Sequence, residues 1–181
     1  MLDDWHDRFP GCPPVAHRLR EGFPDRWVRF HALPGSRRYA ADEADYKTIL
    51  SRYNAVLTLL AEPGSPVVLL TTRYTRTPKP PARPAARPWW SFCDDEGDGI
   101  MDPSHWHVYA SPRPWHPGTF DPIFRRVADD VVRNVMVVAP DCRWLFHPYD
   151  GGMDAILDTS AARDALRATH PGWLSSRPDG L

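Results

Sequence analysis

Residues 42–61, DEADYKTILSRYNAVLTLLA, and residues 67–70, VVLL, decide the fold class of this chain. In the first stretch, apolar side chains recur three and four residues apart, which predicts a helix with one buried stripe. Acidic residues in its first turn suit the helix dipole, and Pro63 and Gly64 end it. The second stretch does not alternate, as expected of a strand covered on both faces. Together they predict helices packed on a β-sheet.

The same order of elements occurs twice along the chain. Strand 26–33, helix 42–61 and strand 67–72 are followed by strand 105–111, helix 121–133 and strand 135–139. Each unit suits a right-handed crossover to a parallel neighbour. Further strands are expected at 89–93, 143–149 and 153–157, with a helix at 160–169 and one short helix near 15–21 in the polar segment 1–24. We therefore expect an α+β fold, with a single mixed β-sheet of about six or seven strands. Two long helices and a C-terminal helix should pack mainly on one face.

Length and charge narrow the class of protein. The 181 residues suit a single domain, 1–181, and the formal net charge of -1 argues against a nucleic-acid binder. Three well-separated cysteines indicate neither a disulfide framework nor a cysteine-rich zinc site. No apolar run approaches the length of a membrane span, and the first residues do not have the pattern of a signal peptide. These features lead us to expect a cytoplasmic protein that does not bind membranes.

Two loops of opposite charge are expected in the middle of the chain. Residues 75–88 carry five prolines, so this proline- and arginine-rich segment can form neither a helix nor a central strand. Residues 94–103 carry Asp94, Glu96 and other acids and form an acidic loop. We expect the two loops to attract each other if they lie within about a Debye length, roughly 8 Å.

Polar side chains repeat with a period of two along several strands, so they share strand faces. The candidate catalytic residues are His105, His107 and Tyr109 on one strand, and Arg29 on another. The candidate binding residues are His31, Arg143, His147, Asp150, Asp154, Trp89 and Trp90. If their strands are neighbours, the His, Arg and Tyr side chains form a patch that can bind an anion. A neutral histidine there can act as a base. The alternative is a solvated polar sheet face.

Metal and cofactor signals are weak. His105 and His107 have a metal-ligand spacing on a strand, which His147 with Asp150 or Asp154 would complete. Asp94, Glu96 and Asp98 resemble the start of a calcium loop, but its twelfth position is His105 instead of glutamate. Phosphate-binding glycine loops and dinucleotide fingerprints are absent from the sequence. The sequence therefore indicates no cofactor.

The segment Arg143 to Ile156, RWLFHPYDGGMDAI, resembles the C-terminal motif of an uncharacterised bacterial family. In that family, Tyr-Asp-Asp-Arg-Gly precedes an apolar residue and Asp, and a helix and a Trp-Leu pair follow. Here Trp173 and Leu174 match the late pair, and the resemblance covers roughly residues 143–175. Asp-Gly-Gly replaces Asp-Asp-Arg-Gly, so the motif's arginine is missing. The resemblance implies no catalytic residue.

Three functional hypotheses follow from these residues. The first is a non-catalytic protein-interaction module of the immunity or antitoxin kind, because Trp, Tyr and Arg dominate binding hot spots. The second is a metal-independent hydrolase or nuclease that uses the His/Arg/Tyr patch on a phosphate-bearing substrate. The third is a metal-dependent enzyme. Whether the protein is an enzyme stays open, and a protein partner is favoured over nucleic acid.

Overall fold

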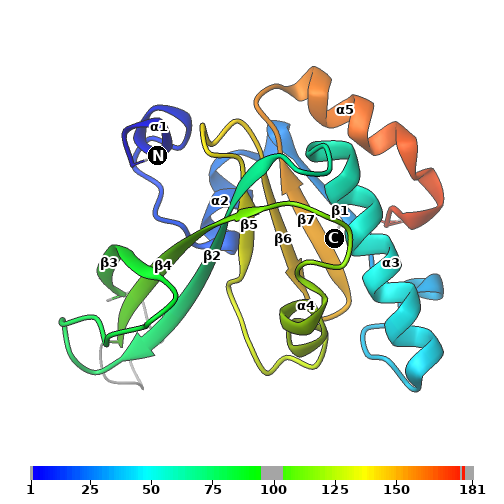
Figure 1. Ribbon diagram of the computed structural model, residues 1–181. Helices are drawn as coiled ribbons and strands as arrows, with labels where there is room; N and C mark the ends of the chain where they lie inside the picture. Colours follow the sequence, from blue (N-terminus) through cyan, green and yellow to red (C-terminus); the bar gives the residue numbers. More distant parts are fainter. Residues whose placement is uncertain (1, 95–103, 176, 178–181) are drawn as a thin grey trace.

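In the part of the chain that the structure describes, seven strands form one β-sheet in the order β1-β7-β6-β5-β2-β4-β3. This computed structural model describes residues 2–94, 104–175 and 177 (Figure 1). The strands are β1 (Trp27–His31), β2 (Pro66–Thr75), β3 (Arg87–Asp94), β4 (Ser104–Pro114), β5 (Met136–Val138), β6 (Leu145–Tyr149) and β7 (Gly152–Ile156). The expected α+β class and single sheet are confirmed. Of the expected acidic loop 94–103, residues 95–103 lie outside the described part.

Every strand pairing within the described residues is antiparallel, so the sheet is not mixed. Strands β1 and β2 do point the same way, but β7, β6 and β5 lie between them. Strands β4 and β5 also point the same way, on opposite sides of β2. The expected crossovers to parallel neighbours are therefore wrong. An unbroken apolar strand indicates burial on both faces, but it does not indicate the direction of the strand beside it.

Three helices cover one face of the sheet, which we call the helical face. They are α3 (Glu43–Leu60), α4 (Asp121–Ala128) and α5 (Ser160–Thr169). The predicted stripe of α3 is buried there, with Ile49, Tyr53 and Leu57 at most 1% exposed. Helix α4 ends before the expected residue 133, and Asp130 beyond it has a left-handed backbone with φ of 56°.

The opposite face is covered by two short helices near the N-terminus, and we call it the N-terminal face (Figure 1). They are α1 (Leu2–Arg8) and α2 (Ala16–Gly22); single turns of 3-10 helix lie at Pro24–Arg26, Pro34–Ser36 and Pro171–Trp173. Helix α2 matches the short helix expected near 15–21, whereas α1 was not expected. Trp5 and Phe9 of this segment are at most 1% exposed, because they pack in the apolar cluster of that face.

The sheet contains a gap between β2 and β6. Strand β5 has only three residues, and its pairing with β2 begins where Met136 faces Leu70. The later residues of β2, and His147 to Tyr149 of β6, therefore have no paired strand on this side. Pro148 fits here because its nitrogen, which has no hydrogen to donate, points away from the β6–β7 hairpin and into the gap. The gap provides a recess in an otherwise continuous sheet.

Candidate functional site

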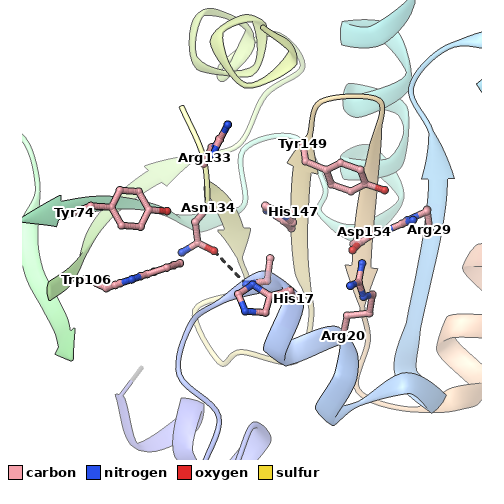
Figure 2. Close-up of a pocket in the computed structure, with 11 residues that line it drawn as sticks. His17, Arg20, Arg29, Tyr74, Trp106, Arg133, Asn134, His147, Tyr149 and Asp154 are labelled. Carbon is pink, nitrogen blue, oxygen red and sulfur yellow. Dashed lines mark hydrogen bonds and ion pairs between the residues drawn. The ribbon is translucent and has the colours of Figure 1, made fainter. Parts of the chain in front are cut away.

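The recess on the N-terminal face holds a cavity of about 260 Å³, which we call the gap pocket (Figure 2). Helix α2 forms one wall, and the others come from β1, β6, β7 and the outer ends of β2 and β4. Its lining residues are Ala16, His17, Arg20, Arg29, Tyr74, Trp106, Arg133, Asn134, His147, Tyr149 and Asp154. A second cavity of about 320 Å³ shares Arg133, Asn134, His147 and Tyr149 with it and extends to Arg38 and Asp150.

His147 lies at the junction of the two cavities and is only 8% exposed. Its Nδ1–H donates to the Val135 carbonyl (2.8 Å), because a carbonyl oxygen can only accept. Burial lowers the pKa of His147, with Arg20 and Arg29 adding to this effect and Asp154 opposing it. The ring is therefore neutral near pH 7, and its Nε2 is an acceptor. None of the described residues donates a hydrogen bond to that atom.

Arg29, Asp154 and Tyr149 form a connected group beside His147. Facing strands place Arg29 opposite Asp154, and Asp154 opposite His147. The Arg29 Nε lies 3.3 Å from Asp154 Oδ1, and its guanidinium lies 5.2 Å from the centre of the Tyr149 ring. Burial raises the pKa of Tyr149 well above its ordinary value; the negative charge of Asp154 adds to this effect, and the positive charge of Arg29 opposes it. The phenol of Tyr149 therefore stays protonated near pH 7.

Gly152 makes room for the Tyr149 ring. A Cβ atom at position 152 would lie 2.5 Å from the Tyr149 hydroxyl oxygen and 2.9 Å from the Phe30 carbonyl oxygen. Position 151 is also a glycine, with φ of 90°, and it lies in the turn that joins β6 to β7. The Arg38 Nε contacts Asp150 Oδ2 at 2.5 Å, so a guanidinium lies beside this turn although the motif's own arginine is missing.

Asn134 holds helix α2 against the gap. Its Oδ1 accepts from the Ala16 backbone N–H (3.1 Å), and its Nδ2 donates to Pro14 O (3.0 Å) and to Thr72 Oγ1 (2.7 Å). The backbone of Asn134 is left-handed, with φ of 51°, a region that asparagine tolerates better than most residues. One buried side chain thus joins α2, β2 and the start of β5.

The two ends of the gap pocket differ in chemistry. Arg20 and Arg29 lie at one end near Asp154, whereas Tyr74 and Trp106 lie at the other (Figure 2). Tyr74 meets the Trp106 ring edge-on, with the ring centres 4.6 Å apart. At the mouth, Arg133 pairs with Asp130 (2.5 Å) and is largely exposed. Three arginines and one carboxylate line the pocket around the neutral His147. Arg29 is paired with Asp154 and Arg133 with Asp130, whereas Arg20 lies 4.0 Å from Glu21.

The structure divides the predicted patch between the two faces of the sheet. Arg29 and His147 of that patch lie together with Asp154, but His105, His107 and Tyr109 face the other way on β4. Their expected convergence with Arg29 is wrong, because β4 is not a neighbour of β1 and its alternation directs Trp106 to the N-terminal face instead.

His107 and Tyr109 instead hold the proline- and arginine-rich loop. The Tyr109 hydroxyl donates to Pro81 O (2.5 Å), and Ser111, two residues later, donates to Ala85 O (3.1 Å). The His107 Nε2 lies 3.1 Å from Thr77 O and its Nδ1 lies 2.9 Å from Ser91 Oγ. Three alternate residues of β4 thus attach the loop to the sheet through carbonyl groups that are four residues apart, those of Thr77, Pro81 and Ala85.

The other predicted residues lie outside the gap pocket. Trp89 and Trp90 pack against α1, with Trp89 edge-on to Trp5 (5.3 Å) and Trp90 beside His6 (5.0 Å). Arg143 is exposed before the opposite end of β6, 3.7 Å from Asp141. The remaining two residues lie closer: Asp150 lines the second cavity, and His31 is on the same strand as Arg29, with a buried Nε2 that has no described partner.

Sequence reasoning missed His17, Arg20, Tyr74, Trp106, Arg133, Asn134 and Tyr149 as pocket residues. Only Tyr149 carried a usable signal, because it alternates with His147 on the same strand face. The others come from α2, the ends of β2 and β4 and the bend before β5, whose proximity depends on the strand order.

The described residues contain neither a cluster of metal ligands nor a membrane-spanning helix. Among them, no group of three or more His, Cys, Asp or Glu side chains is placed to hold a metal ion. The expected set of His105, His107 and His147 is divided between β4 and β6, which are not neighbours in the sheet. No helix within residues 2–94, 104–175 and 177 is long and apolar enough to cross a membrane.

Comparison with known proteins gives a family assignment. A search of the curated proteins and a search of the solved structures each found no match. A family model does match, and it covers residues 15–178, far more than the segment 143–175 whose motif suggested an uncharacterised family. That expectation is confirmed. Since the match spans most of the chain and includes every lining residue of the gap pocket, the chain belongs to the family described as Domain of unknown function (DUF3885).

Proposed function

We propose that this domain is a non-catalytic recognition module of the immunity or antitoxin kind, which binds a protein partner through the gap pocket. The observation that carries the proposal is the convergence of three arginine side chains on the lining of a pocket around a buried, neutral His147. Such a pocket favours an anionic group, and arginine is the side chain best suited to hold one. We therefore expect an acidic group of the partner to enter the pocket.

The surface around the pocket supports a macromolecular partner. Large apolar side chains are exposed there: Tyr74 lines the gap pocket, and Tyr39 and Val131 adjoin residues that line the second cavity. Their exposed fractions are 44%, 54% and 64%. Aromatic and apolar residues beside a charged recess are the composition of a binding hot spot. The lining of the pocket includes no serine, threonine or cysteine nucleophile, which suits binding more than covalent catalysis.

A capture experiment with matched charge reversals tests this proposal. The purified domain is immobilised, a native lysate is passed over it, and stoichiometrically bound proteins are quantified. Arg20→Glu should lower the yield of the captured partner at least about tenfold, because an acidic group would then meet a carboxylate. Arg143→Glu is the control, since Arg143 carries the same charge on a distant surface. Equal capture by both variants, or no partner with the unaltered domain, contradicts the proposal.

A second candidate function is a metal-independent hydrolase or nuclease acting on a phosphate-bearing substrate. The uncommitted Nε2 of His147 beside Arg29 favours it, because a neutral imidazole can take a proton while a guanidinium holds the developing charge. A screen of phosphomonoesters and phosphodiesters with the unaltered domain and His147→Asn tests this candidate. Turnover that His147→Asn removes would support the enzyme. Turnover that persists in the variant, or none in either protein, would argue against it.

A further inference from the structure

The gap pocket offers hydrogen-bond acceptors as well as donors. Arg20 and Arg29 provide guanidinium donors. The Nε2 of His147 is an acceptor, because Nδ1 holds the ring proton. The Asp154 carboxylate accepts from the Arg29 Nε–H, and a carboxylate has about four lone-pair positions in all. A ligand that fills this pocket must therefore accept from the arginines and also donate to at least one of the two acceptors.

This combination of groups discriminates between anions. A carboxylate or a sulfate ester has no proton near pH 7, so it can only accept, and it would face the lone pairs of His147 and Asp154 unfavourably. A phosphate monoester has its second pKa at about 6, so near that pH part of it is singly protonated and has one negative charge shared by two oxygens as well as one O–H donor. That form matches the arrangement of the pocket.

The size of the pocket indicates what else the ligand carries. One water molecule occupies about 30 Å³ in the liquid, and a phosphate group is only a few times larger. A cavity of about 260 Å³ therefore has room for more than the phosphate group. The end away from Arg29 is formed by Tyr74 and Trp106 (Figure 2). Aromatic side chains there suit a flat or apolar group on the ester.

We propose that the gap pocket binds a phosphate monoester with an aromatic or flat organic part, its protonated phosphate between the arginines and the His147–Asp154 acceptors. This inference rests on the proposed use of the gap pocket as the binding site. It goes further because it assigns the chemical class of the group that enters. Phosphorylated aromatic side chains and mononucleotides share this chemistry.

Titration calorimetry at pH 6.5 with the full chain tests the inference. The probes are phenyl phosphate and phenyl sulfate, which have nearly the same shape but differ in whether the anion retains a proton. Phenyl phosphate should bind at least about tenfold more tightly than phenyl sulfate. Methyl phosphate should bind more weakly than phenyl phosphate, because it does not reach Tyr74 and Trp106. Equal affinity for the phenyl phosphate and sulfate, or no binding of phenyl phosphate at millimolar concentration, overturns the inference.

Variants identify the acceptors. His147→Asn should weaken phenyl phosphate severalfold and leave phenyl sulfate unchanged. Asp154→Asn should reduce the preference for phosphate, because its amide offers a donor to sulfate. His116→Asn is the matched control on an exposed loop, and circular dichroism checks that each variant is folded. An unchanged phosphate-to-sulfate ratio in folded forms of both pocket variants also contradicts the inference.

Two further probes distinguish the sources of the phosphate. Tighter binding of a phosphotyrosine peptide than of adenosine monophosphate places the ester on a protein, and the reverse order places it on a nucleotide. Either order supports the monoester class.

Failure of this inference can be distinguished from failure of the proposed function. Partner capture that depends on Arg20 without any phosphate preference removes only the inference. A phosphate preference with capture indifferent to Arg20 removes only the proposed protein-binding role.

Discussion

At the scale of single residues, the geometry of the candidate site depends on Gly152, which has no side chain. The Tyr149 ring occupies the space that a Cβ at position 152 would need, 2.5 Å from its hydroxyl oxygen. The Phe30 carbonyl oxygen, a backbone atom, lies only 2.9 Å from the same point and cannot move easily. Gly152 is therefore required for Tyr149 to lie beside Arg29 and Asp154.

Gly152→Ala should lower the free energy of unfolding by about 1–3 kcal/mol, the usual cost of an overpacked site. The displaced Tyr149 should also become less buried, which should lower its pKa toward the ordinary value. Urea denaturation measures the first effect, and a spectroscopic titration of Tyr149 measures the second. Gly172→Ala is the control, because nothing lies within 4 Å of the added methyl group. Equal unfolding free energies of the two variants would show that the Tyr149 ring can move aside without destabilising the protein.

The lowered pKa of His147 predicts how stability depends on pH. Unfolding restores the ordinary pKa of about 6.5, so the unfolded chain binds a proton more readily than the folded one. The free energy of unfolding should therefore fall as the pH drops below about 6.5, until the lowered pKa of the folded state is reached. Arg20 on α2 and Arg29 on β1 favour the neutral ring, and Asp154 on β7 opposes them.

His147→Asn keeps a donor for the Val135 carbonyl and removes the titrating group. Urea denaturation of both proteins between pH 7.5 and pH 5 should show a smaller loss of stability in the variant. Some loss should remain, because His31 and His170 also have lowered pKa values through burial. Identical dependence of the unfolding free energy on pH in the two proteins would mean that folding does not lower the pKa of His147.

At the scale of elements, helix α2 depends on a side chain from outside the helix. Its N-cap, Val15, has no side-chain oxygen, and the Ala16 N–H is satisfied by Asn134 instead. Asn134→Ala should destabilise the protein by roughly 2–4 kcal/mol, since it removes buried hydrogen bonds and places alanine at a left-handed backbone position. Hydrogen exchange should also become faster in residues 16–22.

Asn134→Gly separates the two causes. It loses the same hydrogen bonds but tolerates φ of 51°, so it should be more stable than Asn134→Ala by about 1 kcal/mol. Both variants should open α2 to a similar extent. If the glycine variant were as stable as the unaltered protein, the hydrogen bonds of Asn134 would contribute nothing to α2.

The same elements show what a sequence can predict. The stripe of α3 was predictable because eighteen residues repeat one apolar pattern. Helix α1 has seven residues and no comparable repeat, so its burial through Trp5 had no local signal. Alternation placed His147 and Tyr149 on one strand face, but nothing in the chain stated which strand lies next to β6. The gap exists because β5 has only three residues, whereas the apolar run 135–139 predicts a longer strand.

At the scale of the whole molecule, strand order decides which polar groups meet. The β6–β7 hairpin pairs with β1 on one side and β5 on the other, so residues far apart in sequence, Arg29 and Asp154, become neighbours. The same order separates His107 from both and assigns it to the attachment of a loop. A patch inferred from alternation alone is therefore correct only within pairs of strands whose neighbours are known.

The family match begins at residue 15, so helix α1 lies outside it but is still part of the fold. Trp5 is fully buried, packs 4.7 Å from Phe9 and 5.3 Å from Trp89, and donates from Nε1 to Cys12 O (2.9 Å). Trp5→Ala should therefore lower the free energy of unfolding by about 3–5 kcal/mol, as expected for a large aromatic side chain removed from a core.

The control is Leu59→Ala, at an exposed position of α3, which should change the free energy of unfolding by less than about 0.5 kcal/mol. Urea denaturation followed by fluorescence should show one cooperative transition in each protein. A loss below about 1 kcal/mol for Trp5→Ala, or a separate early transition in the unaltered chain, would show that α1 is an appendage and that the sheet is stable with its N-terminal face partly uncovered.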